Sequence, residues 1–157
     1  MDISPEAQQI LSASGWTPES FDEKLAEELV GQLHKAQRRR REAATHAFPE
    51  AIRALATYGG IAVPARGPGD TAYRDGFTLT PVDGLTSETA LQELRQLTVD
   101  EEYFFPIGAI PDIHGKLLIS DHGKVVMYGP NGYFLVGNSM NEALNNLIAG
   151  VEPGEFF

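Results

Sequence analysis

The sequence predicts an α+β fold, because segments with helical patterns come first, a block of predicted strands follows, and one predicted helix comes last. Apolar residues at every fourth position indicate the early helices, and short β-branched and aromatic runs joined by turn residues indicate the sheet. The chain has 157 residues, which is the size of about one domain. We therefore expect residues 1–157 to form one domain, with a helical part over 1–58, a sheet with one short helix over 61–137 and a C-terminal helix over 139–150.

The first two helices have recognisable start signals. Ser4 followed by Pro5 predicts a helix that Gly15 ends. Ser20 with Glu23 has the spacing of a capping box, which predicts the start of a second helix there. An apolar stripe at four-residue spacing follows: Phe21, Leu25, Leu29 and Leu33. We interpret this segment as an amphipathic helix that buries the stripe.

A third helix and two strands follow. Phe48 and Pro49 open the helix, and it ends at Tyr58 because two glycines come next. Residues 61–63 and 77–82 have the composition of strands. The connection between these strands is long for a compact protein and contains glycine and proline, so we expect it to be either mobile or functional.

The strongest strand signals lie in the second half, after a short helix predicted over residues 88–97. The runs 117–120, 125–128 and 133–136 are joined by Asp-His-Gly and Gly-Pro-Asn-Gly, which are typical hairpin turns. These runs predict an antiparallel meander, and their continuous apolar character predicts that both faces of its middle strands are covered. A second capping box, Ser139 with Glu142, predicts the last helix.

Composition narrows the possible functions. The chain has no cysteine, which excludes thiolate metal sites and cysteine nucleophiles, and no segment is apolar enough to span a membrane. We expect a soluble, cytoplasmic protein. The net charge is −10, of which −2 lies in residues 1–65 and −8 in residues 66–157. Such an acidic chain repels nucleic acid and favours a basic protein partner.

Several short segments resemble a known family. They are residues 13–16 (Ala-Ser-Gly-Trp), an aromatic residue before Gly59 and Gly60, residues 105–108 (Phe-Pro-Ile-Gly), the hairpin over 117–128, and residues 137–144 (Gly-Asn-Ser-Met-Asn-Glu-Ala-Leu). In this order they resemble the third branch of the SUKH superfamily of bacterial immunity proteins. The resemblance implies a cytoplasmic protein that binds and neutralises a cognate toxin domain of a polymorphic or contact-dependent toxin system, without catalysis. A regulatory or scaffold module of the same fold with another partner is the alternative.

The residues themselves offer no catalytic or metal-binding pattern. His114 and His122 are separated by a predicted strand of about 16 Å, so they cannot share a metal ion. Ser139 follows Gly137 and Asn138 in a weak likeness of a nucleophile elbow, but the second glycine is missing and its capping role already explains the hydroxyl group. We therefore expect no catalytic residue, no bound metal and no cofactor.

The four arginines at 38–41 allow three interpretations. A helix end that projects from the body is favoured, since consecutive arginines cover every face and the buried part of that helix should end near Ala36. Nucleic-acid binding is disfavoured because no aromatic residue interleaves the run. A contact with the protein's own acidic surface or with a second copy is the third, so we expect a monomer or a weak homodimer.

The partner-binding surface is predicted from acidic residues that steer a basic partner and aromatic residues that anchor it. We regard Glu101 and Glu102 as neighbouring exposed carboxylates on one solvated edge, and Phe104 as a further anchor where exposed. The loop over 64–76 is the alternative surface. The predicted partner-binding residues are Asp100, Glu101, Glu102, Tyr103, Asp112, Asp121 and Tyr133.

Overall fold

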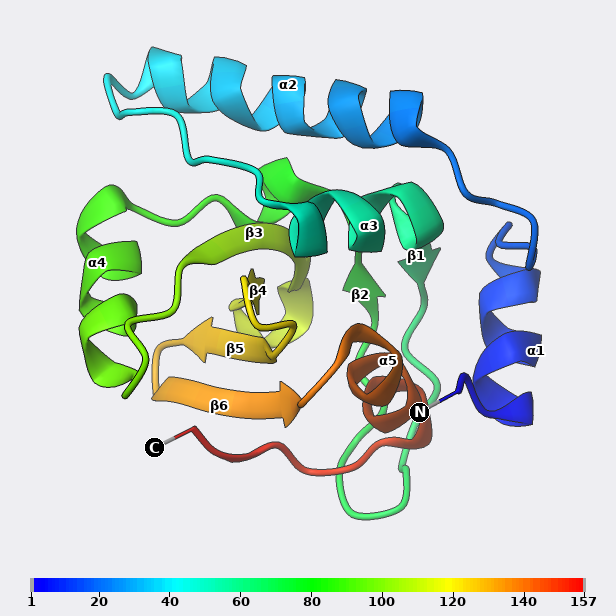
Figure 1. Cartoon of the computed structure of the whole chain (residues 1–157). Helices are drawn as coiled ribbons and strands as arrows, with labels where there is room; N and C mark the ends of the chain where they lie inside the picture. The colour runs from blue at the N-terminus through cyan, green and yellow to red at the C-terminus, as the bar shows by residue number, and fades with distance from the viewer. Residues whose placement is uncertain (1, 157) are drawn as a thin grey trace.

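A computed structural model describes residues 2–156 and has an α+β architecture, as the order of sequence signals predicts (Figure 1). The helices are α1 (Pro5–Ala13), α2 (Glu23–Arg39), α3 (Pro49–Tyr58), α4 (Glu88–Leu97) and α5 (Met140–Ala149). The strands are β1 (Ala62–Val63), β2 (Phe77–Thr78), β3 (Phe104–Ile110), β4 (Gly115–Ser120), β5 (Val125–Gly129), β6 (Gly132–Gly137) and β7 (Gly154–Glu155). Two 3₁₀ turns, η1 (Pro81–Gly84) and η2 (Pro111–Ile113), complete the set.

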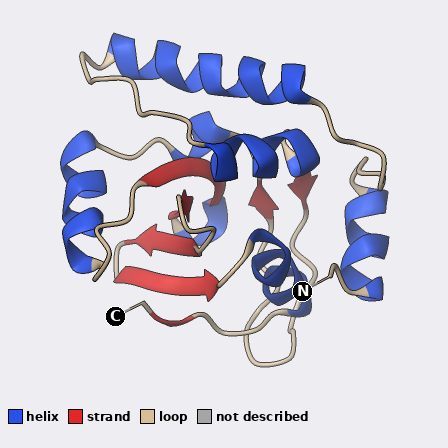
Figure 2. Cartoon of the chain, in the orientation of Figure 1, coloured by secondary structure: helices blue, strands red, loops and turns tan. Residues whose placement is uncertain are grey.

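Within residues 2–156 the strands form a seven-stranded antiparallel sheet in which each strand pairs with the next along the chain. The four longer strands, β3 to β6, lie in the middle, and two-residue strands form both edges. The meander predicted from the second half is therefore confirmed. Figure 2 shows the helices gathered around this sheet, with α2 and α3 side by side above it.

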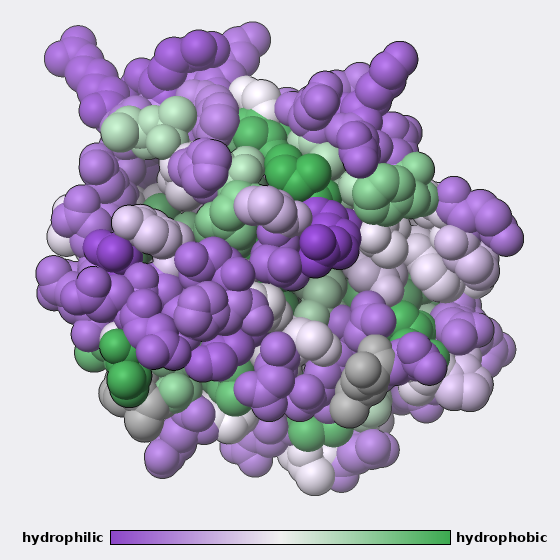
Figure 3. Space-filling view, viewed as in Figure 1, coloured by the Kyte–Doolittle hydropathy of each residue, from purple (hydrophilic) through white to green (hydrophobic). Residues whose placement is uncertain are grey.

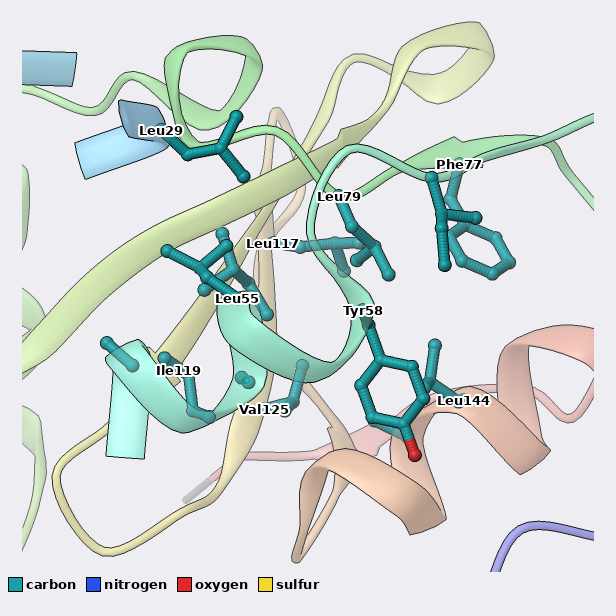
Figure 4. Packing of buried hydrophobic residues seen from close by; sticks show 14 of the residues in the cluster. Leu29, Leu55, Tyr58, Phe77, Leu79, Leu117, Ile119, Val125 and Leu144 are labelled. Atoms are coloured by element: carbon teal, nitrogen blue, oxygen red, sulfur yellow. The ribbon is translucent and has the colours of Figure 1, made fainter. Parts of the chain in front are cut away.

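Both faces of β3 and β4 are buried, and those of β5 and β6 are buried or half-buried, so the middle strands are covered on both sides as their continuous apolar runs predict. Neighbouring residues alternate between two clusters: Leu117 belongs to a large cluster with α1, α2, α3 and α5, and Leu118 to a small one with α4. Figure 4 shows the large cluster, in which Leu55 and Tyr58 of α3 face the sheet and Leu144 of α5 lies beside Tyr58. The small cluster contains Leu94, Phe104, Leu118 and Val126.

The start of α2 differs from the prediction. Asp22, not Ser20, caps this helix, because its carboxylate accepts the backbone N–H of Leu25 at 3.2 Å. Ser20 instead accepts the N–H of Thr17 at 2.8 Å in the preceding turn. Phe21 therefore lies before the helix and is 58% exposed, so its expected place in the buried stripe is wrong.

Strand β3 was not predicted, although it is the longest strand and is buried throughout. Pro106 lacks an N–H group and Gly108 lacks a side chain, so both argue against a central strand. The pairing with β4 shifts between these two residues, which absorbs the missing donor in an irregularity. A Cβ atom at Gly108 would overlap the carbonyl group of Thr78, so glycine allows the close approach of β2.

The connection between β1 and β2 is an ordered hairpin-like loop. Pro68 and Tyr73 form an isolated bridge, and the N–H groups of Asp70 and Thr71 donate to the last carbonyls of α5 and its cap at 2.9 Å. The guanidinium of Arg66 donates to the carbonyl of Ile148 in the same helix end. The predicted strand over 77–82 is shorter than expected, because η1 begins at Pro81.

Among residues 2–156, no helix is both long enough and apolar enough to cross a membrane. In the view of Figure 3, hydrophilic residues cover most of the molecule, and apolar residues appear in small separate patches.

Candidate interaction site

The segment between α4 and β3 carries most of the predicted partner-binding residues. The N–H of Glu102 donates to Thr98 Oγ1 at 2.7 Å, which folds the segment back on the end of α4. Tyr103 N donates to Asp121 Oδ1 at 3.1 Å, and Asp121 N donates to the carbonyl of Tyr103 at 3.0 Å. This reciprocal pair joins the segment to the turn between β4 and β5, so Glu101, Tyr103 and Asp121 share one surface.

Glu102 is buried, with a side chain that is 2% exposed, so the expectation that it is a solvated neighbour of Glu101 is wrong. Ser120 Oγ donates to Glu102 Oε1 at 2.8 Å, and Lys124 Nζ donates to Oε2 at 3.2 Å. The ring of His122 lies 3.5 Å away through Nδ1. Glu102 therefore attaches the segment to the β4–β5 turn and does not face solvent.

A strand signal could have revealed this burial. In extended backbone, residues two apart share one face of the sheet, so Glu102 faces the same side as Phe104. Phe104 belongs to the small cluster under α4, and it is 3% exposed, so it is not available as an exposed anchor. Because β3 was not predicted, this alternation could not be applied.

Tyr103 is the exposed aromatic residue of the segment, with 56% of its surface accessible. The guanidinium carbon of Arg95 lies 4.1 Å from the centre of the Tyr103 ring, a cation–π distance. Arg95 is held there by Glu101, because its Nε donates to the Glu101 carbonyl at 3.0 Å and an NH2 group lies 3.7 Å from the carboxylate. Arg95 is not among the residues predicted from the sequence, because helical spacing alone does not show what lies beyond the end of α4.

Two hollows lie next to each other at this segment, and we call them together the Tyr103 groove. The first, of about 390 Å³, lies between α4 and residues 43–45, and Arg95, Glu101, Tyr103 and Phe104 also line it. The second, of about 460 Å³, is lined by Thr45, His46, Phe48, Tyr103, Phe104 and Asp121. Figure 1 shows α4 and the connection from α2 to α3, the two segments that line the first hollow, on the same side of the molecule.

The connection that forms the other wall is fixed by a buried amide. Gln37 is 1% exposed, its Nε2 donates to Thr45 Oγ1 at 2.7 Å, and its Oε1 accepts Thr45 N at 3.1 Å. The buried part of α2 therefore ends at Gln37, next to Ala36, as expected. Glu42 adds a second link, because its carboxylate accepts the N–H of Glu88 at the start of α4 at 3.0 Å. All four arginines of the 38–41 run are exposed, as expected of a projecting helix end.

The remaining predicted residues lie outside the groove. Asp100 is exposed at the start of the segment, but Asp112 lies in η2, after the opposite end of β3. Burial and the nearby Asp112 carboxylate raise the pKa of Asp75 above its ordinary value of 3.8. Tyr133 is half-buried and stacks on Tyr128 with ring centres 4.8 Å apart. Tyr133 therefore packs on the sheet rather than presenting a free ring.

Three side chains lie close enough together to bind a metal ion, but a lysine already binds one of them. Glu102, Asp121 and His122 each offer an atom, and these atoms lie within 4.8 Å of one another. Both carboxylate oxygens of Glu102 already accept bonds, one of them from the ammonium of Lys124. A cation at this position repels a metal ion, so these residues do not fit a metal site well. His114 lies at the other end of β4 from His122.

The fold and the groove together define an α+β protein with helices on both faces of an antiparallel meander and an acidic, aromatic groove beside one end of it. The SUKH-3 immunity protein family matches residues 3–150, and the chain belongs to this family. Membership supports a role in toxin immunity in general. No curated protein and no solved structure matches the chain.

Proposed function

We propose that this protein neutralises one cognate bacterial toxin domain by binding to it through the Tyr103 groove, in the cytoplasm and without catalysis of its own. The family supports an immunity role. The observation that carries the choice of surface is the combination in one place of an exposed ring, Tyr103, with the carboxylates of Glu101 and Asp121. Protein interfaces concentrate binding energy on such aromatic anchors, with charged groups at the rim.

The charge of the chain supports a basic toxin as the partner. The net charge of −10 is concentrated after residue 65, the part that contains Glu101 and Asp121. Complementary charge raises association rates from about 10⁵–10⁶ to as much as about 10⁸–10⁹ per molar per second at low salt. A fast on-rate suits an inhibitor that must occupy a toxin before the toxin acts.

Growth rescue tests this proposal. The toxin domain encoded beside the gene is produced in a bacterial host, alone and together with this protein. We expect growth arrest with the toxin alone and normal growth with both, while Tyr103→Ala loses most of the protection and Asp112→Asn keeps it. Arrest that persists when both proteins are folded and abundant would contradict an immunity role. Full protection by Tyr103→Ala would instead place the docking surface elsewhere.

A further inference from the structure

We propose that the second hollow of the Tyr103 groove is a pocket for an arginine side chain of the partner, with the ring of Tyr103 as its stacking surface and Asp121 as its counter-charge. This inference rests on the proposed function, since it names the chemistry by which the same groove recognises its partner. Three observations carry it: a guanidinium already on the ring, a carboxylate fixed in orientation, and nearby cations that are already neutralised.

The molecule itself shows that the Tyr103 ring accepts a guanidinium. Arg95 lies 4.1 Å from the ring centre and lines the first hollow, whereas the second hollow is lined by Tyr103 without Arg95. Tyr103 remains 56% exposed with Arg95 in place. A second guanidinium can therefore stack on the ring from the side of the second hollow.

Asp121 is oriented before any partner arrives. Its Oδ1 accepts the Tyr103 N–H at 3.1 Å, and its own N–H is bound to the Tyr103 carbonyl at 3.0 Å. A carboxylate has about four lone-pair sites, so it can accept a guanidinium without losing the bond to Tyr103. The planar fork of arginine suits a fixed carboxylate and a flat ring better than the compact ammonium of lysine does.

The cations near Asp121 do not oppose an incoming positive charge. Lys124 donates to the buried carboxylate of Glu102 at 3.2 Å, and the His122 ring lies 3.5 Å from the same carboxylate. Glu102 therefore offsets the charge of Lys124. Phe48 and Phe104 also line this hollow; both are nearly buried and leave only a small apolar area for the methylene stem of an arginine.

An NMR titration with short peptides tests the pocket without a toxin, so its failure is distinct from failure of the growth rescue. The ¹⁵N-labelled protein is titrated with acetyl-Gly-Arg-Gly-amide and with the citrulline peptide, which has the same shape but no charge. At about 10 mM, ten times a Kd of about 1 mM, we expect the arginine peptide to shift the amide signals of residues 45–48, 103–104 and 121. The citrulline peptide should leave them nearly unchanged, and a lysine peptide should shift them less.

Two variants and a matched control locate the effect. Tyr103→Leu and Asp121→Asn should each reduce the shifts at least threefold, and the asparagine oxygen can still accept the Tyr103 N–H, so the segment stays in place. Tyr73→Leu is the control, because Tyr73 is also 56% exposed but lies in the loop over 64–76. Equal shifts from arginine and citrulline, no shift from arginine, or an unchanged response in Tyr103→Leu would each overturn the proposal.

Discussion

Two connections in this protein differ in length and in how their backbones are held. The loop over 64–76 is long and contains glycine and proline, yet its backbone is bound to the end of α5 and Arg66 reinforces that contact. The segment over 98–103 is short and acidic, yet it presents Tyr103 and Glu101 to solvent and borders both hollows of the groove.

The difference shows that the length of a connection is a poor guide to how firmly its backbone is held. The long loop uses its backbone donors to satisfy the C-terminal carbonyls of a helix, a need that every helix end has. The hydrogen-bonding groups of the short segment are bound by Thr98 and Asp121, and the buried Glu102 binds Ser120. The ring of Tyr103 and the carboxylate of Glu101 remain exposed. Four variants test how these and neighbouring segments are held.

Removing the buried carboxylate should have the largest effect. Glu102→Ala deletes the bonds from Ser120 and Lys124 and should lower the free energy of unfolding by about 2–3 kcal/mol, since hydrogen bonds to a charged group are worth about 1.5–3 kcal/mol. Urea denaturation measures the loss. Glu101→Ala, its exposed neighbour, is the control and should change stability by no more than about 0.5 kcal/mol. Equal effects of the two would show that Glu102 does not hold the segment.

Separating the long loop from α5 should cost somewhat less. A Cβ at Gly69 would lie 2.6 Å from the carbonyl oxygen of Ala149 and from the Cα of Gly150, so Gly69→Ala forces backbone apart and should cost about 1–3 kcal/mol. Gly154→Ala is the control, because nothing lies within 4 Å of that position. Faster amide exchange over residues 69–74 in Gly69→Ala would confirm local opening, and an unchanged thermal midpoint would show that the loop is only loosely attached.

Neutralising the arginine run should have little effect on folding. The four residues over 38–41 are exposed, and the salt bridge between Arg40 and Glu42 is 3.5 Å long with Arg40 55% exposed. Replacing all four by glutamine should change stability by less than about 1 kcal/mol. Gln37→Ala, one residue earlier, removes the buried amide that holds Thr45 and should cost more. A larger loss of stability in the quadruple glutamine variant than in Gln37→Ala would indicate that the arginines pair with groups inside the fold.

The smallest effect is expected where two carboxylates repel each other. Burial and Asp112 raise the pKa of Asp75, so the folded state prefers the protonated form and loses stability as pH rises through that pKa. Asp112→Asn removes the repulsion and should stabilise the protein at pH 7 by only about 0.2–0.5 kcal/mol, because Asp112 is exposed and Asp75 is only partly buried, so water screens the repulsion. The gain should shrink as pH falls and Asp75 becomes protonated, and it should shrink at high salt. A gain that is independent of pH would have another cause.

The parts of the fold that follow from local chemistry were predictable from the sequence. Helix α4 has the predicted bounds, and Ser139 caps α5 as its capping box indicates, with its hydroxyl accepting the N–H of Glu142 at 3.1 Å. The meander followed from its turns, and Gly123 and Gly132 both adopt positive φ there. These features depend on a few neighbouring residues, so the sequence displays them directly.

The features that depend on distant contacts were not predictable in the same way. Strand β3 was missed because Pro106 and Gly108 look unfavourable until the shifted pairing and the approach of β2 are known. For the site, the sequence placed Glu101, Tyr103 and Asp121 among its candidates, but it could not separate them from Asp112. The groove itself needs a wall from residues 43–48, which the bonds of Gln37 with Thr45 and of Glu42 with Glu88 bring into place.

Hydrogen exchange on the complex tests the central claim most directly, which is that the Tyr103 groove is the toxin-binding surface. Exchange of backbone amides is compared between the free protein and its complex with the cognate toxin domain. The account predicts new protection over residues 43–48, over 98–104 and at the turn around Asp121, with residues 64–76 unchanged. Protection that appears over 64–76 or around η2, with the groove unchanged, would contradict it.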